Sequence, residues 1–178
     1  MRLYPGKVTI IAQDMVAALC AIRDNGNPDV EVSPDEVSEV VLDIESVLRE
    51  YIRLDRDMTE RAREKISQEG LEFTQLNKIK QKLAEERNFG VGDRAVEYLT
   101  KQIIEALLHS PQVDEVFAED HALRRTLRDV INRHTHVDDD LDLQVRNRIK
   151  NLQEGTQTWE LEYQKVMGDL RRLKGLDS

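Results

Sequence analysis

The chain has little of what interrupts or cross-links a helical protein. Its 178 residues include one cysteine, four prolines and eight glycines, and aromatic residues make up only 4%. A single cysteine, Cys20, excludes an internal disulfide. The N-terminal region lacks the long apolar run of a signal peptide or membrane span, so we expect no membrane association and a cytoplasmic location.

Charged residues are abundant and mostly acidic. They make up 34% of the chain beside 39% hydrophobic residues, and 26 basic against 35 acidic side chains give a formal charge of -9. This balance is typical of a soluble, folded, helix-rich protein. Because the overall field repels phosphate, general binding to nucleic acid is disfavoured, although a local basic patch could overcome that repulsion.

The sequence contains an internal repeat. The apolar stripe of the first expected helix recurs 88 positions later, and from residue 40 onward the offset becomes 83 because the second half has a shorter loop. The first set of matched positions is Val8, Ile11, Met15, Val16, Ala18 and Leu19 with Val96, Leu99, Ile103, Ile104, Ala106 and Leu107. The matched register favours a tandem duplication.

Each half shows the pattern of four helices, so we predict an all-α protein of about eight helices. The predicted units are residues 1–89 and 93–178, joined by a linker at 90–92 and packed together as a pseudo-dimer. A half of about 90 residues has a small core and gains stability by burying a shared face.

Local signals mark where these helices begin and end. Ser33-Pro34-Asp35-Glu36 is a capping-box pattern that predicts a helix start, and Gly70 and Gly155 predict helix ends. Residues 29–32 and 112–116 are short enough to be extended connectors or a minimal pair of strands. We favour connectors.

The segment HTHVDDD, residues 134–140, raises the question of a metal site. The 83-residue offset aligns it with YIRLDRD, residues 51–57, which keeps the aspartates but not the histidines. We therefore expect Asp55 and Asp138 to cap helices. A calcium loop is excluded because Leu143 and Ile149 occupy the positions of its glycine and glutamate. Two histidines two positions apart diverge on a helix, which disfavours a transition-metal site.

No established catalytic motif is present. The sequence lacks a phosphate-binding loop, a nucleophile elbow and an H-E-x-x-H motif. Basic residues cluster at several helix positions, where the simplest interpretation is a solvated helix face. We predict a non-enzymatic protein without a cofactor.

The sequence also resembles a known bacterial family. The opening MRLYPGKV, the helix pattern IIAQDMVAAL and the segment KNLQEGTQTWELEYQKV are similar to domain of unknown function 507 (DUF507), here in a two-copy form. The resemblance covers essentially the whole chain and implies a small helical protein, but no activity. The first-half counterpart of the C-terminal segment, QEGLEFTQL, lacks the tryptophan, which indicates that the halves have diverged in task.

Three functions remain open at this point. The leading prediction is an interaction or adaptor protein with an unknown protein partner, a homo-oligomer being one option, in which Trp159, Tyr163 and Val166 form the binding surface. The competing interpretation places these three side chains in the core. The second prediction is a nucleic-acid-associated regulator that uses basic helix faces, and the third is a metal-dependent activity. The residues concerned are Arg146, Arg148 and Lys150 for nucleic acid, and His134, His136 and Asp138 for a metal.

Overall fold

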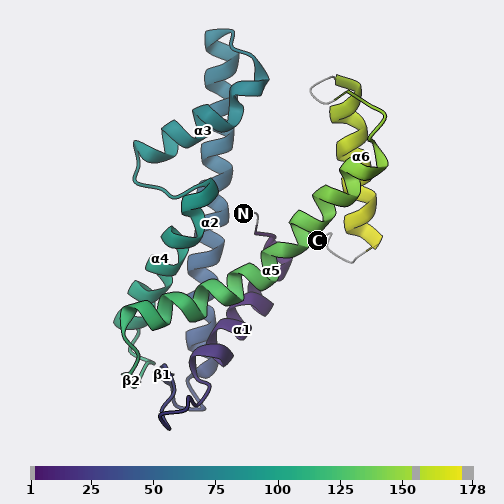
Figure 1. Ribbon diagram of the computed structural model, residues 1–178. Coiled ribbons are helices and arrows are strands. Elements are labelled where there is room, and N and C mark those ends of the chain that lie inside the picture. Colours follow the sequence, from purple (N-terminus) through teal and green to yellow (C-terminus); the bar gives the residue numbers. More distant parts are fainter. Residues whose placement is uncertain (1–2, 154–156, 174–178) are drawn as a thin grey trace.

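The computed structural model describes residues 3–153 and 157–173, without the side chains of residues 136–140, 157 and 160. Within these ranges the chain is predominantly helical, with six α-helices, three 3-10 helices and one two-stranded sheet (Figure 1). The α-helices are α1 (Val8–Leu19), α2 (Val37–Glu69), α3 (Leu76–Glu85), α4 (Ala95–His109), α5 (Asp120–Arg148) and α6 (Gln157–Leu173). The other elements are η1 (Pro5–Lys7), η2 (Phe73–Gln75), η3 (Gly92–Arg94), β1 (Val30–Glu31) and β2 (Glu115–Val116).

One main core joins the two halves of the chain. Helix α1 packs against α2 and α5, and α4 likewise packs against α2 and α5. The stripes that predicted the first helix of each half supply much of this core, because apolar residues spaced by three and four positions share one helix face. Its largest fully buried members include Ile11, Met15, Leu19, Ile44, Leu48, Leu99, Ile103, Leu107, Leu127 and Ile131. The division at residues 90–92 remains a prediction.

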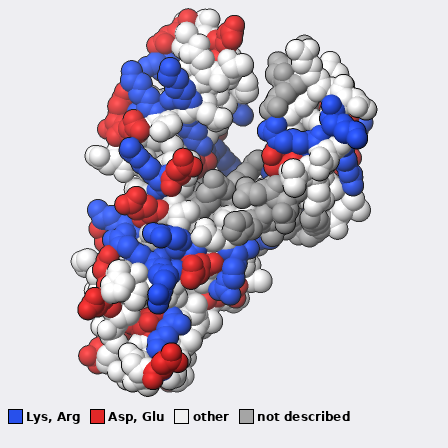
Figure 2. All heavy atoms as spheres, viewed as in Figure 1, with Lys and Arg blue, Asp and Glu red and all other residues white. Residues whose placement is uncertain are grey.

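Two helical arms extend from this core. The C-terminal part of α2 carries α3, and the C-terminal part of α5 carries α6 (Figure 1). The space-filling view shows an open notch between the two arms (Figure 2). Residues 3–5 lie beside α2, and Tyr4 among them contacts Arg171 of α6.

The expected break between the second and third helix of each half is wrong. Helices α2 and α5 are each continuous, so the halves contain three α-helices each where four were predicted. Asp55 and Asp138 lie inside these helices and cannot cap a helix start. The Asp55 carboxylate instead contacts Lys80 Nζ of α3 at 2.7 Å. A partner from another helix thus accounts for an aspartate that looked like a local cap.

Other boundary predictions had mixed outcomes. Gly70 ends α2 in the left-handed conformation, with φ of 63°, as predicted. The capping box is wrong, because α2 starts at Val37 and the Ser33 hydroxyl donates a hydrogen bond to Asp114. Gly155 lies outside the described residues. The favoured connector interpretation is also wrong, since β1 and β2 form an antiparallel pair with Val30 opposite Val116.

The segment between the halves is held by close packing. Phe89 is buried and packs edge-on against Tyr98, with ring centroids 5.0 Å apart. The Tyr51 hydroxyl donates a hydrogen bond to the Gly90 carbonyl at 3.2 Å. A Cβ atom at Gly90 would clash with Tyr98 and lie 2.6 Å from the Arg94 carbonyl oxygen. The chain at Phe89 and Gly90 is therefore closely packed, and position 90 has no room for a side chain.

None of the helices in the described part of the chain combines the length and apolar character that crossing a membrane requires.

Candidate partner-binding surface

The arm formed by α5 and α6 has a small core of its own. Leu141, Val145 and Ile149 of α5 are buried against Met167 and Leu170 of α6. The three predicted binding residues, Trp159, Tyr163 and Val166, are half-buried and pack against this cluster. The structure thus brings them together on one hairpin, where they serve partly as core and keep part of their surface exposed.

The two aromatic side chains form a stacked pair. The rings of Trp159 and Tyr163 have centroids 4.9 Å apart and an interplanar angle of 24°. The guanidinium carbon of Arg146 lies 5.5 Å from the Trp159 ring centroid, within the range of a cation–π interaction. These contacts hold the aromatic surface in a fixed orientation on the hairpin.

The Asp142 carboxylate of α5 holds Tyr163 of α6 in place. The Tyr163 hydroxyl donates a hydrogen bond to Asp142, which also accepts one from Arg146 Nε at 2.7 Å. Partial burial and the bond to Asp142 raise the pKa of Tyr163 to about 12. Burial opposes ionisation of Asp142, but the bonds from Tyr163 and Arg146 outweigh it and lower the pKa of Asp142. Tyr163 therefore remains a neutral donor and Asp142 an ionised acceptor at neutral pH.

The same hairpin exposes large apolar side chains. Leu143 of α5 is 60% exposed, and Leu161 and Leu173 of α6 are 66% and 78% exposed. Leucines on a solvent-facing helix surface contribute nothing to the hairpin core. They are available for contact with another molecule.

The basic cluster predicted for nucleic acid lies on this hairpin too. Arg146 is engaged by Asp142 and Trp159, whereas Arg148 and Lys150 are exposed near the end of α5. Because the Arg146 guanidinium already contacts Asp142 and Trp159, a phosphate would have to compete with these two residues to bind it.

The predicted metal site is only partly visible. His134 Nε2 lies 2.7 Å from Asp14 Oδ2 of α1, so this imidazole links α5 to α1. The side chains of His136 and Asp138 lie outside the described residues. Among the side chains that are described, no three His, Cys, Asp or Glu residues form a group suited to a metal ion.

A cavity that the sequence did not indicate lies on the α2 side of the notch. It has a volume of about 560 Å³ and is lined by the N-terminal segment, α2 and Lys80 of α3. The lining residues that carry charge or polar groups are Tyr4, Tyr51, Asp55, Arg56, Thr59, Glu60, Arg63 and Lys80. The spacing of Arg56, Thr59 and Arg63 places them on one helix face, which is the only signal that the sequence contains.

Helix α6 contacts the N-terminal segment at one arginine. Arg171 donates a hydrogen bond to the Tyr4 hydroxyl at 2.7 Å, and its guanidinium carbon lies 5.0 Å from the Tyr4 ring centroid. Tyr4 also lines the notch cavity. This residue therefore connects the α6 arm with the cavity on the α2 side.

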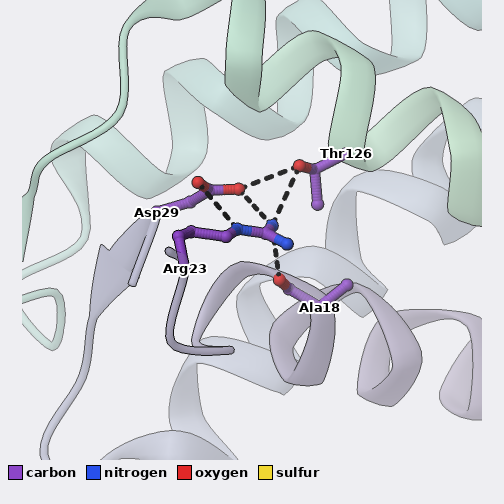
Figure 3. Close-up of polar contacts among 4 residues, drawn as sticks. All are labelled: Ala18, Arg23, Asp29 and Thr126. Atoms are coloured by element: carbon purple, nitrogen blue, oxygen red, sulfur yellow. Dashed lines mark hydrogen bonds and ion pairs between the residues drawn. The ribbon is translucent and has the colours of Figure 1, made fainter. Parts of the chain in front are cut away.

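A buried polar network fixes the loop between α1 and β1 (Figure 3). Asp29 is 7% exposed and accepts hydrogen bonds from Arg23 Nε at 3.1 Å and from the Thr126 hydroxyl of α5 at 2.8 Å. Arg23 also donates to the Ala18 carbonyl at 2.9 Å. Burial disfavours the charged carboxylate, but the bonds from Arg23 and Thr126 outweigh it and lower the pKa of Asp29. The network is a structural clamp between the two halves.

Comparison with known proteins identifies a family. The model of the family described as "Protein of unknown function (DUF507)" matches residues 1–176. No match was found among curated proteins. The match covers nearly the whole chain, and the protein therefore belongs to the DUF507 family.

Proposed function

We propose that this protein is a non-enzymatic interaction or adaptor protein that binds a protein partner through the α5–α6 hairpin. The observation that carries the proposal is the exposed apolar surface of this arm. Leu143, Leu161 and Leu173 are each at least 60% exposed on a hairpin that already has its own core. Exposed leucines that belong to no core give this hairpin apolar area that a protein partner would cover.

The stacked aromatic pair adds further exposed area on the same hairpin. Trp159 and Tyr163 keep part of their area exposed while Arg146 and Asp142 hold their rings in place. Rigid aromatic side chains lose little conformational entropy on binding, which makes them effective anchors.

The proposal includes an internal duplication that forms a pseudo-dimer. Helices α1, α2 and α3 correspond in order to α4, α5 and α6, and β1 corresponds to β2. Each of α1 and α4 packs against both α2 and α5, and β1 pairs with β2. These reciprocal contacts are what a two-fold arrangement of two copies produces. In this view the arms are equivalent extensions that have diverged in sequence.

A pair of exposed substitutions tests the binding surface. The double variant Leu143→Glu and Leu161→Glu changes solvent-facing positions and leaves the hairpin core intact. The tagged full-length chain, incubated with extract of its native host, is expected to retain a specific protein that the double variant loses. Leu42→Glu is the matched control, because Leu42 is 52% exposed on α2.

Circular dichroism of all variants checks that the fold persists. Trp159→Ala is a second probe, expected to lose the same protein while retaining its helical signal. Equal retention by the wild-type chain and the double variant would contradict the proposed surface.

A further inference from the structure

The face of α2 that lines the notch differs from the rest of the helix in how its arginines are paired. Five arginines occur along α2, and three of them form ion pairs with acidic residues of the same helix: Arg49 with Glu45, Arg53 with Glu50 and Arg61 with Asp57. Arg56 and Arg63 are the other two, and both line the notch cavity. In the described part of the chain neither of them contacts a carboxylate. The arginines without a counter-charge are therefore the ones that border the cavity.

The remaining charges of the cavity leave a positive balance. Asp55 lines it, but Lys80 Nζ lies 2.7 Å from its carboxylate and neutralises it. Glu60 is the other acidic lining residue. Two arginines thus face one uncompensated carboxylate in a protein whose overall charge is -9.

A further positive charge lies beside the cavity. Arg171 contacts the ring and hydroxyl of Tyr4, and its buried Nε atom has no hydrogen-bond partner among the described residues. An anion bound in the cavity would stabilise the guanidinium charge of Arg171 through its field. Arg171 reaches the cavity only through Tyr4, so it adds to the local potential without lining the site.

We propose that the notch binds an acidic α-helix of a protein partner, whose carboxylates pair with Arg56 and Arg63. This inference rests on the proposed interaction function and names the chemistry of the partner. Arg56 and Arg63 are seven residues apart, which corresponds to a rise of about 10.5 Å along α2. A partner helix lying along α2 presents side chains seven residues apart at the same spacing, so two of its acidic residues meet both arginines.

The aromatic residues of the cavity favour a protein over a nucleic acid as the occupant. Tyr51 is buried, and Arg171 covers the ring of Tyr4. Tyr51 is thus closed to a base, and one face of the Tyr4 ring is already occupied by the guanidinium, so base stacking has little aromatic surface here. Charge complementarity with carboxylates requires no such surface.

The probe for this inference is a fluorescently labelled, alanine-rich helical peptide of about 20 residues. It carries glutamates in pairs seven residues apart, and a second peptide has glutamine in their place. Fluorescence anisotropy at low salt measures binding to the full-length protein. We expect the glutamate peptide to bind, the glutamine peptide to bind at least about tenfold more weakly, and added salt to weaken the binding.

Substitutions locate the binding. The variant Arg56→Gln and Arg63→Gln is expected to weaken binding of the glutamate peptide by about tenfold or more. Lys78→Gln and Lys82→Gln form the matched control, because these two lysines are exposed on α3 and lie outside the cavity lining. Glu60→Gln should strengthen binding, because it removes the acidic lining residue that no lysine neutralises.

Several results would overturn the inference. These are absence of binding at low salt, equal loss in the lysine control, or equal binding of the glutamine peptide. Tighter binding of a labelled single-stranded RNA, lost in the same arginine variant, would replace the acidic helix by nucleic acid. If the peptide fails to bind while the leucine variant still loses its partner, only this inference fails and the proposed function stands.

Discussion

The Thr126 hydroxyl donates a hydrogen bond of 2.8 Å to the Asp29 carboxylate, joining residues 97 positions apart. Arg23 forms an ion pair with the same carboxylate within the loop before β1, and its guanidinium also donates a hydrogen bond to the Thr126 hydroxyl at 3.1 Å, so the loop is attached to α5 through Thr126 (Figure 3). The backbone adds to this attachment, because the Phe117 and Ala118 amides both donate to the Asp29 carbonyl. One residue of the first half thus holds two segments of the second.

Replacing Asp29 by asparagine should make stability less sensitive to acid. The folded-state pKa of Asp29 is lowered, so its contribution is complete above the unfolded pKa of about 3.9 and is lost as the pH falls through the folded value. We expect Asp29→Asn to reduce the free energy of unfolding by about 1–3 kcal/mol at pH 7. In urea unfolding from pH 7 to pH 2, the difference from wild type should shrink steadily.

Thr135→Val provides the control on the same helix. The Thr135 hydroxyl donates to the Ile131 carbonyl within α5, and no carboxylate among the described side chains is its partner. The effect of Thr135→Val on the free energy of unfolding should therefore stay the same over the pH range in which Asp29 is protonated. A constant difference between Asp29→Asn and wild type over the whole pH range would show that the clamp does not depend on charge.

The spacing of apolar residues was sufficient to locate the helices of the main core. Stripes at three- and four-residue intervals predicted α1, α4 and the N-terminal parts of α2 and α5, because burying such a stripe is the main source of helix stability in a folded chain. The predicted end of α2 at Gly70 is confirmed for a local reason, since glycine alone adopts the left-handed conformation without strain.

Predictions failed where a side chain has a partner from a distant part of the chain. Asp55 resembled a helix cap but pairs with Lys80, and Ser33 resembled a capping residue but bonds to Asp114. The same limit applies to the cavity at the notch, because tertiary packing alone brings Tyr4 and Arg63 to the same cavity. Trp159, Tyr163 and Val166 were interpreted from sequence either as a binding surface or as core, and the structure places all three half-buried against the hairpin core.

Gly90→Ala should be one of the most destabilising single-methyl additions in the chain. The new Cβ would collide with Tyr98 and the Arg94 carbonyl, so the packed linker must shift. We expect a loss of about 1–3 kcal/mol in the free energy of unfolding, as for other overpacked sites.

Gly168→Ala is the matched comparison, because a Cβ atom at this position in α6 would have no other atom within 4 Å. That substitution should stabilise the protein by up to about 1 kcal/mol through helix propensity, and urea titration of both variants measures the contrast. Equal stability of the two variants would contradict the close approach at Gly90.

The two valines Val130 and Val145 allow the cores of the main body and of the α5–α6 arm to be compared. Both lie on α5 and are almost fully buried, but Val130 belongs to the main core and Val145 to the small cluster beneath α6. The chain has a single tryptophan, Trp159, which packs against that small cluster. Tryptophan fluorescence therefore reports on the arm, whereas far-ultraviolet circular dichroism reports on all helices.

We expect Val145→Ala to separate the two signals during urea unfolding. Removing the side chain costs about 1–3 kcal/mol at either site, and this is a larger fraction of the stability of a small core than of a large one. In Val145→Ala the fluorescence transition should move to lower urea and precede the loss of helix. In Val130→Ala both transitions should shift together, because α1, α2, α4 and α5 share the main core. Coincident transitions in both variants would contradict this expectation, because the arm would then unfold only together with the main body.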